Sequence, residues 1–199
     1  MRCPACHSPA AEFDAACRHC GFCQELADTH LGLPPLITPP IADLIGGSLS
    51  AGERRAILKA IATLEQQLPQ IRAVVVFAEP PPIAPVAIYT MWLFNRANLF
   101  GPLQRGGDNH GILLLLAPRQ LRACLMLGYG LEPFVPEELL AMPLSRSAHE
   151  MIAGRAPSAA LVALNLLTHA LPPLCRALPK VFGYPPEAST PASTSDDIF

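Results

Sequence analysis

The sequence has little net charge, and nothing at its start resembles a secretion signal. Its 14 lysines and arginines nearly balance 16 aspartates and glutamates, which gives a formal net charge of -2. Nucleic-acid-binding domains usually carry a basic excess, so we expect no nucleic-acid partner. The opening Met-Arg-Cys-Pro is not followed by an apolar run, so the sequence indicates no secretory signal.

The sequence also lacks the common catalytic and membrane signatures. It contains no Ser-His-Asp order, no phosphate-binding P-loop and no dinucleotide fingerprint. The apolar stretch 159–171 is interrupted by Asn165 and His169 and is expected to stop at Pro172. That is too short for a membrane-spanning helix, so we expect no membrane span and a cytoplasmic protein.

The composition of the sequence divides it into four parts. Residues 1–25 are rich in cysteine, and residues 26–47 form a linker punctuated by proline and glycine. Residues 48–178 have the apolar content of a globular body. Residues 179–199 are rich in proline, serine and threonine and end with acidic residues, a composition that favours a disordered tail.

Apolar periodicity within 48–178 predicts a layered α/β domain. Ser50 and Glu53 have the spacing of a capping box, and Pro69 ends the helix that they begin. Further helices are predicted at 85–100, 136–154 and 156–171, with strands at 71–79, 111–117 and 122–129. Because the strands are apolar throughout, we expect a central sheet with helices on both faces, a three-layer α/β/α arrangement.

Five of the seven cysteines lie within the first 23 residues. Cys3 and Cys6 form one Cys-x-x-Cys pair, and Cys17 and Cys20 form a second. This spacing lets both thiolates of a pair face one tetrahedral ion. We predict that these four cysteines bind a structural Zn²⁺ in a small zinc ribbon, with Cys23 able to replace Cys20.

Other roles for the cysteines and nearby histidines stay open. His7 and His19 are spare ligand candidates. Disulfides or free thiols are the alternative, but disulfides are disfavoured in a cytosolic protein. Four thiolates leave no open position on the metal, so we expect structural stabilisation without chemistry there. Cys124 and Cys175 fall within the predicted body and are interpreted as core residues.

Polar residues frame the two strands at 111–117 and 122–129. Asp108 and Asn109 precede the first strand, and Tyr129 and Glu132 follow the second. If the strands are antiparallel, these four residues share one edge of the sheet, where their oxygens suit a hard cation or a phosphate group. The alternative is that they are turn residues, a packed aromatic and a helix-leading acid. His110 could act as an acid or base but fits a solvated loop, and Trp92 fits the core.

Three stretches, FNRANLFG, GGDNHGILLLLA and LRACLMLGYGLE, resemble the TPM domain, a family named for its thylakoid, photosystem and nematode-receptor-associated members. The resemblance implies a sheet with helices on both faces, a divalent-cation site for Ca²⁺ or Mg²⁺, and the acid phosphatase activity attributed to some members. The residues that match are Asp108, Asn109, Gly111, Gly128, Tyr129, Gly130 and Glu132, with Asp43 as a further match before the first helix.

The sequence therefore supports three functional hypotheses. The first is an accessory or assembly module with a zinc ribbon, protein partners and a cation site. The second is a metal-assisted phosphomonoester hydrolase that uses Asp108, Asn109 and Glu132. The third, nucleic-acid binding through the ribbon, is disfavoured because few basic residues surround its cysteines. Whether the protein is an enzyme stays open.

Overall fold

The computed structural model describes residues 3–9, 14–101 and 110–181. The helices and strands follow one another in the order α1 (Gln24–Leu31), β1 (Ile41–Asp43), α2 (Ala51–Gln67), β2 (Arg72–Phe77), α3 (Val86–Arg96), β3 (Gly111–Ala117), β4 (Arg122–Leu127), the 3₁₀ helix η3 (Glu132–Phe134), α4 (Glu137–Ile152) and α5 (Ala156–Val181).

The four strands form one sheet in the order β1-β2-β3-β4. β1, β2 and β3 are parallel, whereas β3 and β4 form an antiparallel pair in which Ile112 lies opposite Leu127. The prediction that the last two strands run in opposite directions is therefore confirmed. Their turn is tight, with Leu121 in the left-handed region at a φ of 52°.

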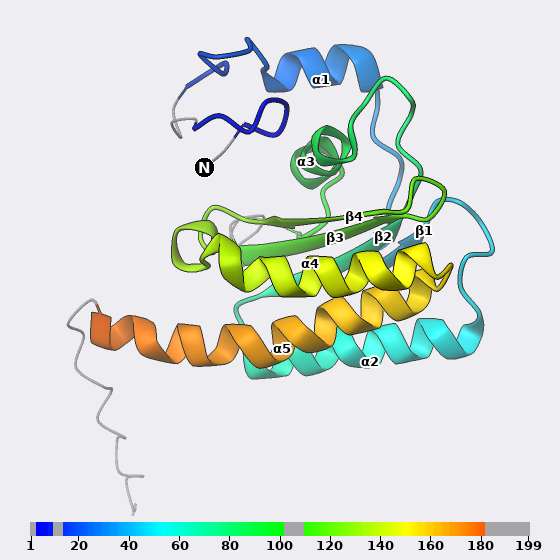
Figure 1. Ribbon diagram of the computed structural model, residues 1–199, viewed down its shortest axis with the longest axis vertical. Coiled ribbons are helices and arrows are strands. Elements are labelled where there is room, and N and C mark those ends of the chain that lie inside the picture. Colours follow the sequence, from blue (N-terminus) through cyan, green and yellow to red (C-terminus); the bar gives the residue numbers. More distant parts are fainter. Residues whose placement is uncertain (1–2, 10–13, 102–109, 182–199) are drawn as a thin grey trace, which may run out of the picture.

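Helices cover both faces of the sheet. Helices α2, α4 and α5 lie against one face, α3 lies against the other, and α1 packs outside α3 (Figure 1). This is the three-layer α/β/α arrangement that the sequence predicts.

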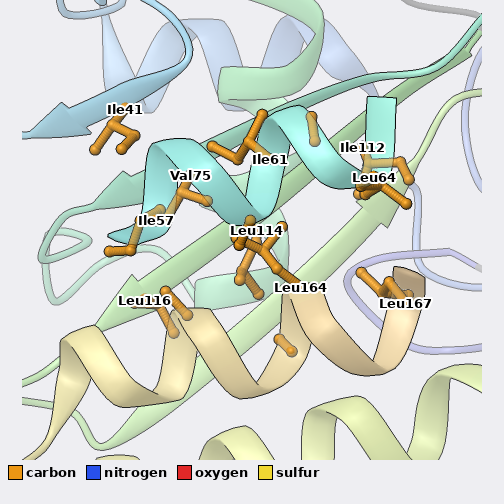
Figure 2. Packing of buried hydrophobic residues seen from close by; sticks show 14 of the residues in the cluster. Ile41, Ile57, Ile61, Leu64, Val75, Ile112, Leu114, Leu116, Leu164 and Leu167 are labelled. Atoms are coloured by element: carbon orange, nitrogen blue, oxygen red, sulfur yellow. The ribbon is translucent and has the colours of Figure 1, made fainter. Parts of the chain in front are cut away.

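Alternation along the strands divides the core between the two faces. Val75, Leu114 and Leu116 pack with α2 and α5, as Figure 2 shows. Their neighbours Val74 and Leu115 belong to the second cluster, with α3 and part of α1. Since successive side chains of a strand point to opposite faces, a strand covered on both sides must be apolar throughout.

The first long helix begins as its sequence predicts. The Ser50 hydroxyl accepts a hydrogen bond from the Glu53 backbone N–H at 3.3 Å, and the Ser50 N–H donates to the Glu53 carboxylate at 2.8 Å. These two bonds satisfy donors that a helix start leaves free. The Ser50 hydroxyl also donates to the Glu53 carboxylate at 2.6 Å, and this bond, together with the one from the Ser50 N–H, lowers the pKa of the Glu53 carboxyl.

Two sequence predictions about boundaries are wrong. Residues 26–47, expected to be a linker, contain most of α1 and the whole of β1; a three-residue strand is too short to show a periodicity. Pro172, expected to end a helix, lies inside α5. Pro173 lies inside α5 as well, and an interior proline costs about 3 kcal/mol. The burial of Leu171 against the core, with Leu174 packed beside it, favours the continued helix. The tail predicted at 179–199 therefore begins within α5, and residues 182–199 lie outside the described chain.

Helix α5 is both long and apolar. Its segment Ala156–Cys175 is long and apolar enough to cross a membrane, with a mean hydropathy of 1.4. Core helices share this length and composition. Here one side of the helix, which includes Ala159, Ala163 and Leu167, is fully buried against the sheet and α2. This packing accounts for its apolar character.

Candidate functional site

One group of side chains in the described chain is close enough together to hold a metal ion. The Sγ atoms of Cys3, Cys6, Cys17 and Cys20 all lie within 4.8 Å of one another. We call these four residues the cysteine cluster. Cys3 and Cys17 are buried, whereas Cys20 is exposed, so the cluster lies at the surface of its segment.

The distances within the cysteine cluster fit tetrahedral zinc. The Cys3 and Cys20 sulfurs are 3.7 Å apart, and the Cys6 and Cys17 sulfurs are also 3.7 Å apart. Four sulfurs placed about 2.3 Å from a zinc ion at tetrahedral angles are about 3.8 Å from one another. A disulfide would instead bring two sulfurs to about 2.05 Å. The group can therefore hold a metal such as zinc.

The two Cys-x-x-Cys pairs fold into matching turns. In the first, the His7 N–H donates to the Cys3 carbonyl at 2.9 Å, and the Cys3 N–H donates to the Ser8 carbonyl at 2.9 Å. In the second, Gly21 and Phe22 make the equivalent bonds with Cys17, each at 2.8 Å. His7 and Gly21, at equivalent positions, both have positive φ, 58° and 72°.

Hydrogen bonds also reach the sulfurs. The hydroxyl and the backbone N–H of Ser8 donate to the Cys6 thiolate and lower the pKa of Cys6 to about 6. The Phe22 N–H acts on Cys20 in the same direction. Without metal, however, desolvation and the neighbouring thiols outweigh it and raise the pKa of Cys20 to about 12. Zinc takes its thiol ligands as thiolates, and these backbone donors stabilise that form.

The spare ligands suggested by the sequence lie outside this group. Cys23, His7 and His19 are not among the atoms that converge. Cys23 is the residue that immediately precedes α1. His7 instead occupies the left-handed position that follows the second cysteine of its turn.

Asp28, on α1, joins the cysteine-rich segment to the α/β domain. Its Oδ1 accepts hydrogen bonds from Trp92 Nε1 at 3.1 Å and from Arg96 Nε at 3.0 Å, both on α3. The bonds from Arg96 hold the pKa of the Asp28 carboxyl below its usual value. Ala27 is buried beside them, and Phe22 packs against the same cluster. Neither periodicity nor spacing signals this long-range contact, and the sequence analysis missed it.

The sheet edge that the sequence singles out is partly described. The Gly128 N–H donates to the Gly111 carbonyl at 2.9 Å, so the start of β3 and the end of β4 do meet. The chain then turns sharply, with the Leu131 and Glu132 N–H groups both donating to the Gly128 carbonyl. Neither Gly128 nor Gly130 has a positive φ. This turn therefore does not depend on glycine in the left-handed region.

The side chains proposed for this edge do not all come together. Tyr129 is half exposed, and Glu132 begins η3. Asp108 and Asn109 lie outside the described residues, so their place beside Glu132 stays a prediction. Asp43 ends β1, opposite Phe77. Strand β2 begins beside Gly111 and ends at Phe77. Asp43 therefore lies at the opposite end of the strands from Gly111.

Asp43 stabilises its own loop. Its carboxylate accepts hydrogen bonds from the backbone N–H groups of Ile45 at 3.3 Å, Gly46 at 3.1 Å and Ser48 at 2.8 Å. Gly46 and the next residue, Gly47, have φ values of 81° and 74°, which side chains other than glycine rarely adopt. These contacts account for Asp43 without a bound ion.

The remaining residues singled out from the sequence have packing roles. Cys124 and Cys175 are half-buried, and burial raises the pKa of both thiols, so neither resembles an activated nucleophile. Trp92 is 2% exposed, which confirms its place in the core. His110 lies directly before β3, at the edge of the described chain.

Comparison with known proteins identifies a fold. No family model matches the chain, and no curated protein matches its sequence. Among solved structures it resembles the N-terminal domain of the cg2496 protein of Corynebacterium glutamicum, with 16% identity over 69% of this chain and 83% of that one, at a TM-score of 0.51.

Two other bacterial structures are similar in the same way. One is the N-terminal domain of a P. gingivalis protein, with 19% identity over 67% of this chain and 82% of that one, at a TM-score of 0.51. The other is the BA42 protein of Bizionia argentinensis, with 16% identity over 65% of this chain and 86% of that one, at a TM-score of 0.54. At these identities the likeness shows a shared α/β fold alone.

Proposed function

We propose that this protein is a cytoplasmic, zinc-stabilised accessory module that binds other proteins, with no reaction taking place at the metal. The observation that carries the proposal is the closed set of four sulfurs, which would leave a bound zinc ion no position for water or substrate. When bound, Zn²⁺ would supply folding free energy to a segment too small to form its own core.

The contact between α1 and α3 supports a structural role for the metal. One ion bound by both Cys-x-x-Cys turns would fix the start of α1, and Asp28 fixes α1 against α3. The metal would thereby hold one wall of the α/β domain in place. Protein partners fit this role because the surface near α1 and β1 is apolar, with Leu33 and Leu36 more than nine-tenths exposed.

Hydrogen exchange tests the structural role of zinc. Zinc-loaded protein should protect the backbone amides of residues 3–9 and 14–23, and removal of the metal should abolish that protection while amides of β2 and β3 stay protected. Exchange within β2 and β3 that rises as much as in the cysteine segment would contradict a local structural role.

The TPM resemblance supports one alternative, a metal-assisted phosphatase with a Ca²⁺ or Mg²⁺ site. The observation in its favour is the antiparallel pairing that brings Gly111 and Gly128 together at one edge of the sheet. Hydrolysis of p-nitrophenyl phosphate that requires Ca²⁺ or Mg²⁺ and is lost in both Asp108→Ala and Glu132→Ala would establish it. Activity that survives in Asp108→Ala, or its absence in the wild type, would exclude this site as a phosphatase.

A further inference from the structure

A recess lies at the carboxyl end of the parallel strands. Its volume is ≈ 480 Å³, and residues that follow β1 (Leu44, Ile45) and β2 (Ala78, Glu79) line it. After β1 the chain passes to α2 on one face of the sheet, and after β2 it passes to α3 on the other (Figure 1). Connections that diverge in this way open a crevice between neighbouring strands, which is where open α/β sheets bind their ligands.

Most of the residues that line the recess are apolar. Leu31 and Leu33, at the end of α1, face it together with Leu44 and the ring of Trp92. Leu33 is 92% exposed. Pockets of 300–1,000 Å³ lined by apolar and aromatic groups with a few polar ones are typical of small-molecule sites.

Two of the loops that line the recess are joined by hydrogen bonds. The Glu79 carboxylate accepts a hydrogen bond from the Arg119 backbone N–H at 2.6 Å, and Gln120 Nε2 donates to the Pro80 carbonyl at 3.1 Å. These bonds attach the β3–β4 turn to the loop after β2. Glu79 and Arg119 are consequently held at the same recess.

Both charges at the recess lack a charged partner. No ion pair joins the Glu79 carboxylate to the Arg119 guanidinium, or either group to another side chain in the described chain. An anion and a cation thus line one recess separately. A ligand with one charge would satisfy only one of them, whereas a ligand with both charges would satisfy the pair.

A third polar group is available there. Tyr89 is 9% exposed and lines the recess, and its hydroxyl has no hydrogen-bond partner among the described residues. Every fully buried side-chain oxygen and nitrogen in that part of the chain does have a partner. The Tyr89 hydroxyl is therefore not completely enclosed, and Tyr89 is one of the residues that line the recess. Buried tyrosine hydroxyls usually find a partner, which here would come from a ligand.

From this arrangement we infer that the recess binds a free α-amino acid with an apolar side chain. The ammonium group pairs with Glu79, the carboxylate pairs with Arg119 and accepts a hydrogen bond from Tyr89, and the side chain packs against Leu31 and Trp92. The side of the recess that α1 forms rests on the proposed role of the metal, so the zinc-loaded protein is the one to test, whereas the Glu79 and Arg119 contacts involve neither the metal nor phosphatase activity.

Conservative substitutions separate the three polar contacts from the fold. Glu79→Gln keeps the oxygen that accepts from Arg119 but removes the charge. Arg119→Gln keeps the backbone N–H that donates, and Tyr89→Phe removes only the hydroxyl. Arg146→Gln is the matched control, because Arg146 is an exposed arginine on α4, across the sheet from α3.

The experiment is a titration of the full-length protein with L-leucine, leucinamide and N-acetyl-leucine. Trp92 is the only tryptophan, so its fluorescence reports on the recess, and calorimetry measures affinity independently. Leucinamide lacks the carboxylate, N-acetyl-leucine lacks the ammonium, and each resembles one end of a peptide. Leucine should bind more tightly than either, and each of the three recess substitutions should weaken it about tenfold or more. The Arg146→Gln control should bind as the wild type does.

Several results would overturn the inference. They are the absence of leucine binding, equal affinity for N-acetyl-leucine or leucinamide, and binding unchanged in Glu79→Gln or Arg119→Gln. Melting temperatures of the variants close to that of the wild type would show that a loss of affinity comes from the missing contact. Glu79→Gln should also reduce the preference for leucine over N-acetyl-leucine, an effect that unfolding cannot produce.

Discussion

Asp28 and Trp92 are 64 residues apart in the sequence, yet the Asp28 carboxylate accepts the indole N–H of Trp92 at 3.1 Å. Arg96, one turn further along α3, donates two hydrogen bonds to the same carboxylate. A single acidic side chain thus ties the helix that follows the cysteine cluster to the helix that covers one face of the sheet.

Replacing Asp28 should loosen this contact. In Asp28→Ala the indole N–H of the buried Trp92 loses its acceptor and Arg96 loses its ion pair, so we expect a lower melting temperature and a red-shifted tryptophan emission. Asp14→Ala is a suitable control, because Asp14 pairs with Arg18 within the cysteine-rich segment. An unchanged emission in Asp28→Ala would mean that the contact does not hold α1 in place.

Metal removal should have a related effect. The cysteine cluster fixes the start of α1, so a strong chelator should free α1 from α3 and expose Trp92. We expect the emission to shift to longer wavelength on chelation and to return when Zn²⁺ is added. Far-ultraviolet circular dichroism should change little, because the packing of the sheet against α2 and α5 does not involve the cysteine cluster. Loss of the overall helical signal would contradict this separation.

Stability should depend on pH through the contact between α4 and α5. The Arg155 guanidinium donates two hydrogen bonds to Glu150, at 2.7 and 3.0 Å, and holds the pKa of that carboxyl below its usual 4.5. Because folding lowers the pKa of Glu150, the stabilisation is complete at pH values above its usual pKa. It disappears as the pH falls through the pKa of Glu150 in the folded protein.

Chemical denaturation of wild type and Glu150→Gln across this range would test that dependence. The wild type should be the more stable of the two at about pH 6, and the difference should shrink toward about pH 3 as Glu150 becomes protonated. Glu150 lies far from the cysteines in the sequence, and both proteins carry the same metal ligands. A difference that stays constant with pH would show that the ion pair does not contribute.

Gly111 should tolerate no side chain. A Cβ atom at this position would lie 2.8 Å from the ring of Phe100, which also packs at a tilt against Phe94, with 4.9 Å between the ring centroids. Gly111→Ala must therefore displace a packed ring, and overpacking of this kind costs about 1–3 kcal/mol. Denaturation of Gly111→Ala and of Gly52→Ala, where space is available, would measure the effect. Equal stability of the two variants would rule out the steric explanation.

The sequence predicted the fold well wherever a pattern was long. The capping box at Ser50, the strands with apolar residues on both faces and the antiparallel pair that begins at Gly111 all have local signals, and the structure confirms them. Prediction from the sequence failed where the structure depends on tertiary contacts. Strand β1 is only three residues long, and α5 continues past Pro172 because it packs against the core.

The site was predictable to a similar extent. Cys-x-x-Cys spacing identified the cysteine cluster because a tetrahedral ion requires that local geometry. Asp43 was grouped with Tyr129 and Glu132 by resemblance, although parallel strands place it at the other edge of the sheet. The recess could not be predicted, because Glu79 and Arg119 come together through a contact between loops 40 residues apart.

The account depends most directly on the metal content of the purified protein. Elemental analysis should find about one zinc per chain in the wild type and in Cys23→Ser, because Cys23 lies outside the cysteine cluster. Cys17→Ser should lose most of the metal, since it removes a buried ligand. A wild type without zinc, or a Cys23→Ser variant that loses zinc as completely as Cys17→Ser does, would contradict the assigned site.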